Sequence, residues 1–373
     1  MLFHPYEIAF SGFSGTGKTT LAAAVAKHLS ERFAVGCYKH GCHRFDMDRK
    51  GKDSFIFRAA GAETVMISDP VKKAVISGSA SGDISESRIF RSCDLLIVEG
   101  LKELPLPKLL MVDRNRKILD LLEPGGIPEV VALVETGDEP KELEKRFELP
   151  VFQRDDVATI TAFIESRFGA TAAATPLSGL ILAGGRSARM GTDKALLCYH
   201  QDNQLMHTAN LLRRYCNEVF VSCRPDQEYR YVDHGLPVIT DRYLETGPLG
   251  GLLSAQRLYP ERAWLTAACD MPFIETGLLD TLVDNRMPLR FATAFRDAET
   301  LRYEPLLACY EPKSHQELLA RHAEGNSSLH SFLAGSRTGD IILPDIGPLR
   351  NINDPAAAGK ARNACRMSTK EPT

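Results

Sequence analysis

The stretch EIAFSGFSGTGKTT, Glu7–Thr20, opens on a short apolar run and passes through a glycine-rich turn into a helical pattern. Within it, Gly12–Thr19 fits G-x-x-x-x-G-K-[ST] without a mismatch. Glycines in such a loop let backbone N–H groups turn inward around a phosphate, and the helix start adds partial positive charge. The stretch therefore predicts a strand, a phosphate loop and a helix, the beginning of an α/β domain that binds a nucleotide.

The side chains at this loop suit a nucleoside triphosphate with Mg²⁺. We expect the amine of Lys18 to reach the terminal phosphates and the hydroxyl of Thr19 to hold Mg²⁺. Glu99 ends the apolar run DLLIVE, and an acid at a strand's carboxyl end can order Mg²⁺ and water beside such a loop. The alternative for Glu99 is a carboxylate that faces solvent. The predicted nucleotide contacts are Gly12, Gly15, Gly17, Lys18, Thr19 and Thr20, with Thr19 and Glu99 at the metal.

Apolar runs extend the α/β prediction along the first half of the chain. Short, nearly continuous runs suit strands buried on both faces of a mostly parallel sheet. A helix is expected over Thr19–Phe33. Strands are expected at Glu7–Phe10, Ala34–Lys39, Glu63–Ser68, Asp94–Glu99, Lys108–Asp113 and Val130–Glu135.

The small, uncharged stretch GATAAATP, Gly169–Pro176, separates a helical pattern ending at Phe168 from a new series of strands and helices. It predicts a linker, although a long loop inside one domain would have a similar composition. We therefore expect two α/β domains: a P-loop NTPase-type domain over residues 1–168 and a Rossmann-like domain over residues 177–373. The polar residues after about Arg362 are expected to form a loose tail.

The charged stretch from Tyr38 to Glu63 allows several interpretations. Two Cys–His pairs point to zinc, but no second ligand pair with metal spacing follows. Acidic and basic side chains there can instead surround a nucleotide, or form a solvated loop. The residues concerned are Cys37, His40, Cys42 and His43 for zinc, and Asp46, Asp48, Lys50, Lys52 and Asp53 for the nucleotide.

Taken together, three segments of the first half resemble MobB, the P-loop GTP-binding accessory protein of molybdopterin guanine dinucleotide synthesis. They are GFSGTGKTT, KHGCHRFDMDRKGKDSFIFRAAGAE and DLLIVEGLKELPLPKLLMVDR. The resemblance covers about Glu7 to Phe168. It implies GTP binding, weak hydrolysis at most and homodimerisation through this domain.

A second glycine loop, LAGGRSARMGTDKALL (Leu182–Leu197), follows the first apolar run of the second half. Backbone at Gly184 and Gly185 can approach a nucleotide closely because glycine has no side chain. Arg189 and Lys194 would neutralise a triphosphate and a departing pyrophosphate. This string is not a Walker loop, and it resembles the loop of nucleotidyltransferases that place a nucleoside monophosphate on a phosphorylated acceptor.

Two acids follow later in the second half. Asp270 comes directly after the apolar run WLTAAC, a position suited to Mg²⁺. Asp241 lies in VITDRYLETGPLGG, where the proline and glycines are expected to admit a ligand against a helix start. Taken alone, Asp241 fits a surface acid as well as it fits a ligand-binding acid.

These motifs, with RNINDP at Arg350–Pro355, resemble MobA, the molybdenum cofactor guanylyltransferase. The resemblance covers about Leu177 to Arg362. It implies transfer of GMP from GTP to Mo-molybdopterin, with molybdoenzyme apoproteins or their chaperones receiving the product. It also carries GTP contacts over to Leu182, Ala183, Gly184, Lys194, Asp241 and Asp270, with Mg²⁺ at Asp270. Ser222 stands where some members have Asn, which leaves one base or ribose contact open.

The composition agrees with an enzyme of small molecules. A net charge of −3 over 373 residues gives no reason to expect nucleic-acid or anionic-membrane binding. An apolar run of membrane-spanning length and a signal-peptide pattern are both absent from the sequence, and nine scattered cysteines suit a reduced cytoplasm. The alternative functions are a cytidylyl- or sugar-nucleotidyltransferase and a non-catalytic, GTP-dependent cofactor carrier.

Overall fold

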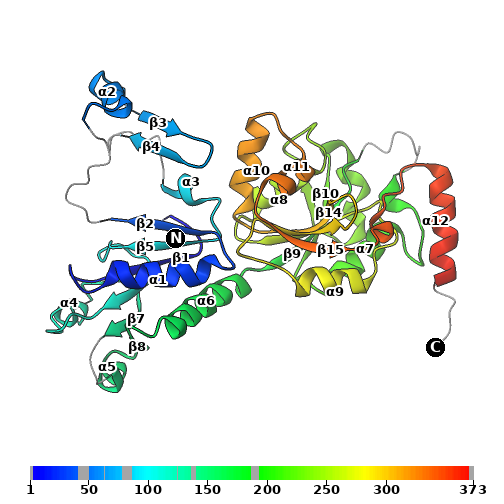
Figure 1. Ribbon diagram of the computed structural model, residues 1–373. Coiled ribbons are helices and arrows are strands. Elements are labelled where there is room, and N and C mark those ends of the chain that lie inside the picture. The colour runs from blue at the N-terminus through cyan, green and yellow to red at the C-terminus, as the bar shows by residue number, and fades with distance from the viewer. Residues whose placement is uncertain are drawn as a thin grey trace. The chain divides into compact units, whose positions relative to one another are not determined.

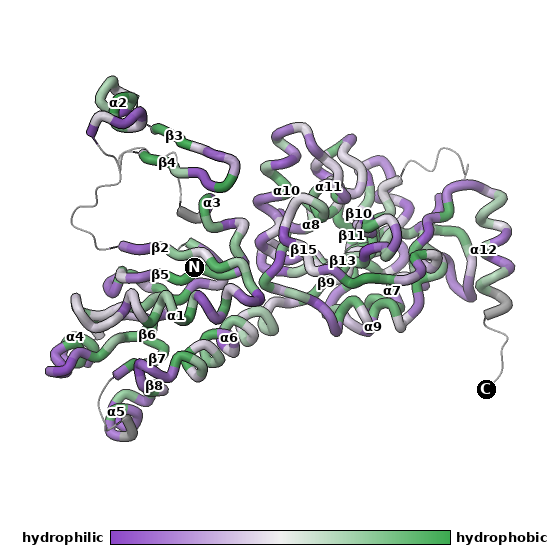
Figure 2. Tube along the Cα trace, viewed as in Figure 1, coloured by the Kyte–Doolittle hydropathy of each residue, from purple (hydrophilic) through white to green (hydrophobic). Residues whose placement is uncertain are grey.

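The computed structural model describes residues 3–40, 50–62, 64–77, 86–123, 125–135, 140–185 and 193–368. The chain divides into two compact units, Met1–Phe168 and Gly169–Thr373 (Figure 1). Each unit is built around its own sheet, and the strands at the centre of each sheet are coloured hydrophobic in Figure 2. Both units are α/β, as the strand pattern predicted.

The sheet of the first unit has six strands in the order β2-β5-β1-β6-β7-β8, and every pairing is parallel. β1 is buried throughout and lies between β5 and β6. The strands are β1 (Glu7–Ser11), β2 (Val35–Lys39), β5 (Leu95–Glu99), β6 (Lys108–Met111), β7 (Val130–Glu135) and β8 (Val151–Gln153).

The helix after the first loop, α1 (Lys18–Ser30), buries Leu21, Ala22, Val25 and Leu29. This spacing puts one apolar stripe on the sheet and leaves the opposite face to solvent. The other helices are α2 (Asp53–Ala59), α3 (Glu86–Phe90), α4 (Leu119–Leu122), α5 (Pro140–Phe147) and α6 (Val157–Ala173).

One expected strand of the parallel sheet lies elsewhere. β3 (Thr64–Ser68) pairs antiparallel with β4 (Lys73–Ser77) in a separate two-stranded sheet. The prediction that Glu63–Ser68 belongs to the main sheet was wrong, because a short apolar run fits a hairpin strand as well as a buried one. Met66, Ile67 and Val75 remain about half exposed or more on this hairpin.

The predicted linker is largely helical. α6 continues from Val157 to Ala173, so the helix runs through the first five residues of the stretch expected to connect the domains. Alanine is the strongest helix former, and four of the seven residues from Gly169 to Thr175 are alanine. Only residues 174–176 separate α6 from β9 (Leu177–Leu182).

The second unit has a seven-stranded sheet in the order β11-β10-β9-β12-β14-β13-β15. Its pairings are parallel except those of β14, which runs antiparallel to β12 and β13. The strands after β9 are β10 (Val219–Cys223), β11 (Val238–Thr240), β12 (Ala263–Ala268), β13 (Ala292–Asp297), β14 (Tyr303–Tyr310) and β15 (Thr338–Leu343).

Helices cover this sheet and close the second unit. Helix α12 (Pro355–Ser368) buries Ala361 and Cys365 in a small cluster that includes Tyr199. The expected loose tail from Arg362 is therefore helical as far as Ser368. Ala361 and Cys365, one helical turn apart, pack in the cluster with Tyr199, and the sequence alone does not indicate this contact. The remaining helices are α7 (Gln204–Leu212), α8 (Pro248–Leu258), α9 (Thr276–Asp284), α10 (Ser314–Ala323) and α11 (Leu329–Gly335), with 3₁₀ turns η1 (Lys194–Leu196), η2 (Pro225–Arg230), η3 (Val232–His234) and η4 (Gly347–Leu349).

Candidate functional site

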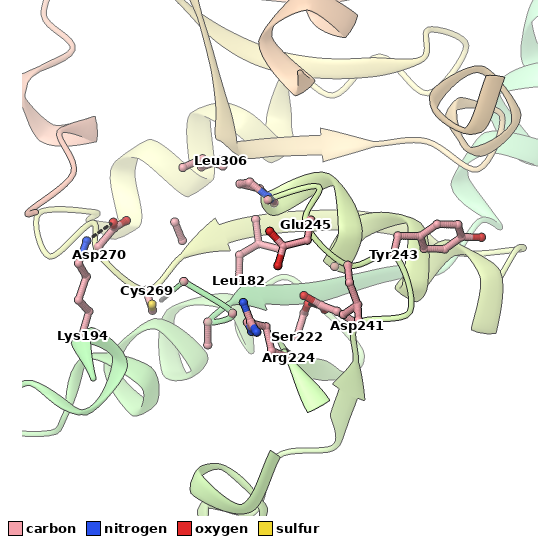
Figure 3. Close-up of a pocket in the computed structure, with 18 residues that line it drawn as sticks. Leu182, Lys194, Ser222, Arg224, Asp241, Tyr243, Glu245, Cys269, Asp270 and Leu306 are labelled. Atoms are coloured by element: carbon pink, nitrogen blue, oxygen red, sulfur yellow. Dashed lines mark hydrogen bonds and ion pairs between the residues drawn. The ribbon is translucent and has the colours of Figure 1, made fainter. Parts of the chain in front are cut away.

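A cavity of about 400 Å³ opens at the carboxyl ends of β9, β10, β11 and β12 (Figure 3). After β9 the chain continues to β10 on one side of β9, whereas β12 pairs with the other side of β9. In open α/β sheets, such a reversal of strand order leaves a crevice where ligands bind. Seven predicted residues line this cavity: Leu182, Ala183, Gly184, Gly185, Lys194, Asp241 and Asp270. Arg189 lies outside the described residues.

At one end of the cavity, Lys194 joins two segments that are distant in sequence. Its Nζ lies 3.2 Å from Asp270 Oδ2 and donates to Asn353 Oδ1 at 2.5 Å. The side chains of Lys194 and Asp270 are only 16% and 18% exposed, so their charges interact with little screening by water. A backbone hydrogen bond also joins the segments of Asp270 and Asn353, since Ile352 N donates to Asp270 O at 2.8 Å. Asn353 lies in the RNINDP stretch, but the sequence alone gave it no partner.

The second carboxylate oxygen of Asp270 is the atom that fits a cation. Oδ1 is buried, and no described residue gives it a hydrogen-bond partner. Among the described residues, no group of three or more His, Cys, Asp or Glu is placed to hold a metal. Mg²⁺ is commonly bound by one or two carboxylates together with substrate phosphates and water, so a carboxylate with an unpartnered oxygen on a residue that lines the cavity suits it.

Asp241 lies at the other end of the cavity, where β11 ends. Ser222 Oγ donates to its Oδ1 at 2.6 Å, and Asp241 is 9% exposed. Burial raises the pKa of Asp241 to about 6, although the Ser222 hydroxyl and the Arg224 guanidinium both act to lower it. A Cβ at Gly184 would lie 3.1 Å from Asp241 Oδ2, so glycine there brings the loop backbone close to this carboxylate.

The GPLGG turn borders the cavity, as expected, and its glycines also allow close helix packing. Gly247, with φ +62°, and Pro248 line the cavity at the start of α8, as the motif predicted. Gly251 lines the cavity as well, and both Gly250 and Gly251 let α8 pack closely. A Cβ at Gly250 would meet Tyr243 O at 2.3 Å, and one at Gly251 would meet Ser222 Oγ at 2.2 Å. Gly251 therefore allows α8 to approach Ser222, and Gly250 allows it to approach the backbone of Tyr243.

A larger cavity of about 760 Å³ shares Pro248 and Leu306 with the first. Its lining includes Arg302, Glu304 and Arg350. Burial raises the pKa of Glu304 to about 6, and the nearby negative charge of Asp270 acts in the same direction. Leu306 and Pro248 therefore border both cavities.

The first unit has a separate loop site between β1 and α1. Gly12 (φ +150°) packs against β6, where a Cβ would meet Met111 O at 2.8 Å, and Gly17 takes the left-handed conformation that starts α1. Gly15 (φ +79°) lies at the exposed tip. Lys18 Nζ donates to Phe13 O at 2.6 Å and thus folds back over the loop. Burial lowers the pKa of Lys18, and the positive charges of Lys39 and Lys102 act in the same direction.

Thr19 and Glu99 meet beside this loop, as the phosphate-loop motif predicted. Thr19 Oγ1 donates to Glu99 Oε1 at 2.8 Å. Lys39, at the end of β2, lies 3.1 Å from both Glu99 Oε1 and Thr19 Oγ1. The alternative of a solvent-facing Glu99 is therefore wrong. Thr20 follows on α1 with an exposed side chain. Lys39 was not predicted, because nothing in its local sequence shows that β2 lies beside β5.

Of the four residues considered for zinc, Cys42 and His43 lie outside the described residues. Asp46 and Asp48 lie there as well.

The sequence matches two families along its length. Residues 179–340 match the MobA-like NTP transferase domain, and residues 8–136 match molybdopterin guanine dinucleotide synthesis protein B. A molybdenum cofactor guanylyltransferase of Pseudomonas entomophila is 31% identical over 170 residues, which cover 44% of this chain and 85% of that protein.

The chain belongs to the molybdenum cofactor guanylyltransferase family.

In this chain a MobB domain precedes the MobA-like nucleotidyltransferase domain. A molybdenum cofactor biosynthesis bifunctional protein of Synechocystis is 35% identical over 204 residues, 54% of this chain and 58% of that protein, so the match spans just over half the length of that relative. Molybdopterin-guanine dinucleotide biosynthesis protein A of Archaeoglobus fulgidus has 19% identity and a TM-score of 0.43, over 51% of this chain and 99% of that structure. In the described part of the chain, no helix is both long enough and apolar enough to cross a membrane.

Proposed function

We propose that the MobA-like unit transfers GMP from GTP to Mo-molybdopterin. An oxygen of the acceptor's terminal phosphate attacks the α-phosphorus of GTP and forms a new P–O bond. The bond between the α-phosphorus and the bridging oxygen breaks, and its electron pair leaves with pyrophosphate. The acceptor phosphate is already an anion, so no covalent enzyme intermediate is needed, and catalysis consists of positioning and charge stabilisation.

The observation that supports this reaction most is the convergence of Gly184, Lys194 and Asp270 on one cavity. Backbone at Gly184 offers close approach to the nucleotide, and the Lys194 ammonium lies where phosphate charge would collect. Because Lys194 is largely buried and held by Asn353, it needs little reorganisation when charge develops on the departing pyrophosphate. Negative charge on the leaving group is the main electrostatic demand of this reaction.

We assign the guanine to the Asp241 end of the cavity. Ser222 occupies Oδ1 of Asp241, which leaves Oδ2 facing the glycine loop. A carboxylate accepts hydrogen bonds and donates none, and guanine offers it two adjacent donors, N1–H and N2–H₂, whereas cytosine offers one amino group beside two acceptors. This chemistry favours GTP over CTP and argues against the cytidylyltransferase alternative.

The acceptor is assigned to the larger cavity. Arg302 and Arg350 supply positive charge for a phosphate, and Leu306 borders both cavities, so the acceptor phosphate can approach the nucleotide from this side. Asp270 Oδ1 would hold Mg²⁺ together with the phosphates of GTP, and Thr19 with Glu99 would hold a second ion in the MobB unit. When bound, Mg²⁺ supplies neutralisation of phosphate charge.

For the MobB unit we propose an auxiliary role in binding GTP, with weak hydrolysis, while molybdoenzyme apoproteins or their chaperones receive the finished cofactor. Lys18, which now covers the loop carbonyl of Phe13, would turn to the phosphates when nucleotide enters.

Purified protein incubated with Mo-molybdopterin and either GTP or CTP tests the proposal. We expect pyrophosphate release with GTP and at least tenfold less with CTP. A preference for CTP would overturn the guanine assignment. Binding of GTP without pyrophosphate release would favour the non-catalytic carrier.

A further inference from the structure

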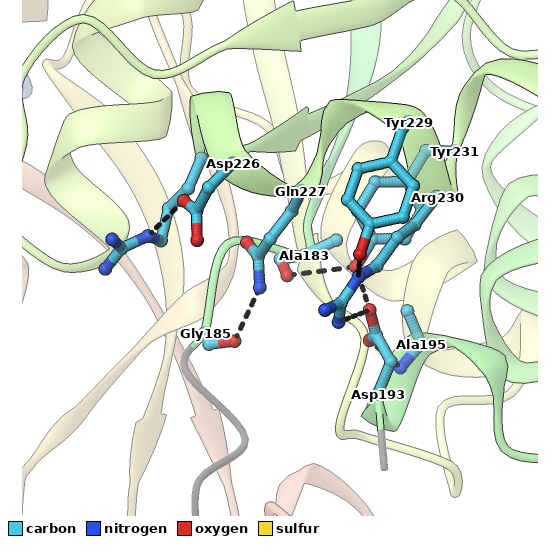
Figure 4. A network of polar contacts seen from close by, with 10 residues as sticks. Ala183, Gly185, Asp193, Ala195, Asp226, Gln227, Tyr229, Arg230 and Tyr231 are labelled. Atoms are coloured by element: carbon cyan, nitrogen blue, oxygen red, sulfur yellow. Dashed lines mark hydrogen bonds and ion pairs between the residues drawn. The ribbon is translucent and has the colours of Figure 1, made fainter.

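The segment between β10 and β11 reaches the base of the second glycine loop from outside the nucleotide cavity. It consists of η2 and η3, and it sends Gln227, Arg230 and Tyr231 toward the chain on either side of the loop (Figure 4). Tyr231 is fully buried and Gln227 is 6% exposed. Buried polar side chains of this size are retained where their hydrogen bonds fix neighbouring structure.

At the start of the glycine loop, this segment contacts the backbone that follows β9. Gln227 Nε2 donates to Gly185 O at 3.2 Å, and Tyr231 Oη lies 3.4 Å from Ala183 O. Both carbonyls belong to residues that line the nucleotide cavity. The position of the glycine backbone is therefore set in part by a segment that does not belong to the sheet.

Toward the end of the glycine loop, the same tyrosine contacts Asp193, the residue before Lys194. Tyr231 Oη lies 2.7 Å from Asp193 Oδ2, much closer than Ala183 O, so its single proton is donated to the carboxylate. Arg230 Nη1 adds a contact to the same oxygen at 3.3 Å. Burial raises the pKa of Tyr231 strongly, and its hydrogen bond to Asp193 adds to the rise, so the hydroxyl keeps its proton.

The other oxygen of Asp193 fixes the backbone around Lys194. Asp193 Oδ1 accepts from Ala195 N at 3.1 Å and caps the turn η1, which begins at Lys194. From this turn the Lys194 side chain reaches Asp270 and Asn353. A continuous set of hydrogen bonds thus leads from Tyr231 through Asp193 to the turn that carries the cavity lysine.

We propose that Tyr231 is a positioning residue of the transferase, whose hydroxyl holds Asp193 so that Lys194 is presented to the triphosphate. Tyr231 is completely buried, so it acts through Asp193 and not by contact with a ligand. The proposal rests on the proposed role of Lys194 in binding the phosphates of GTP.

A double-mutant cycle between Tyr231→Phe and Lys194→Ala tests the coupling in the full-length protein. Tyr231→Phe removes one oxygen, and we expect it to weaken MgGTP binding to the transferase site and to lower kcat for pyrophosphate release, each about tenfold. In the Lys194→Ala background the same change should alter MgGTP binding less than twofold. The Lys18→Ala substitution is present in every protein, so that binding to the MobB unit does not obscure the measurement.

Tyr229→Phe is the matched control, because Tyr229 is 68% exposed and its hydroxyl contacts only Arg230 among the described residues. It should change MgGTP binding and kcat less than twofold. Equal losses from Tyr231→Phe with and without Lys194 would overturn the proposal, since a purely structural role predicts that result. If Tyr231→Phe fails to fold, Asp193→Asn is put through the same cycle and should show the same dependence on Lys194.

The two readouts separate the proposals. Pyrophosphate release tests the transferase function, whereas the MgGTP dissociation constant tests the coupling even if no transfer is seen. Non-additive binding without turnover would support the role of Tyr231 and contradict the proposed function.

Discussion

The two glycine loops of this chain each follow the first strand of a mostly parallel sheet and each lead to a lysine, but the two lysines obtain their partners differently. In the MobB unit, Lys18 and Thr19 are consecutive and begin α1 directly after the loop. In the MobA-like unit, Lys194 is joined to Asp270 and Asn353, which lie 76 and 159 residues further along the chain. The lysine and the hydroxyl of the first site are neighbours in sequence, and Lys39 and Glu99 join them from other strands. In the second site the lysine itself is held only by distant segments among the described residues.

This difference matches what each site has to do. A loop with its lysine and hydroxyl on one helix turn presents both groups, together with its backbone N–H groups, to one triphosphate. A transferase must also align a second substrate with the α-phosphorus, so its charged groups have to come from several strands around a shared cavity. The predictions that follow test this contrast.

The largest effect is expected from Asp270→Asn. The substitution removes the charge that pairs with Lys194 and the anionic oxygen available to Mg²⁺, so pyrophosphate release should fall by about 10³-fold or more. Phosphate release by the MobB unit should be unchanged, as should the unfolding midpoint within a few degrees. Transfer within tenfold of the wild type would remove Asp270 from the mechanism.

Lys18→Ala is the reciprocal change. Nucleotide affinity of the MobB unit should fall about 100-fold and its GTP hydrolysis should slow, because the ammonium that faces the phosphates is lost. Lys194→Ala serves as the matched control. It should lower pyrophosphate release by the transferase unit and leave phosphate release by the MobB unit unchanged. If Lys18→Ala abolished transfer, the two loops would share one active site and the contrast between them would fail.

The pH dependence of GTP use should report on Asp241. Its pKa of about 6 means that the carboxylate is ionised at pH 8 and gains a proton as the pH falls through 6, losing its capacity to accept from guanine. The KM for GTP should therefore rise about tenfold for each pH unit below 6. A terminal phosphate also titrates near this pH, so Asp241→Asn is measured in parallel and should lack this component.

The smallest effect is expected from Ser222→Ala. Loss of the hydroxyl that donates to Asp241 should raise the KM for GTP about threefold at pH 8. Because this hydrogen bond lowers the pKa of Asp241, its removal should also move the acid limb of the pH profile to higher pH. A change in KM with an unmoved acid limb would show that Ser222 contacts the nucleotide without acting through Asp241.

Much of the fold and of the MobB loop could be predicted from the sequence, because alternating apolar runs and a continuous motif are local signals. The errors have physical causes. A short apolar run does not show whether its partner strand is in the main sheet, so β3 was misplaced, and alanine-rich composition favours a helix as much as a linker. Asn353, Lys39 and Tyr231 were not assigned roles, because each depends on which strands and turns become neighbours in the folded chain.

The bond between Lys194 and Asn353 also affects how the protein can be made. Glycine backbone, lysine and Asp270 emerge from the ribosome well before Asn353, and Lys194 precedes Asn353 by 159 residues. A nascent chain that has completed β12 therefore contains the charged pair but not the amide that restrains its lysine. We therefore expect phosphate chemistry only after the segment that carries Asn353 has been synthesised and has folded against Lys194.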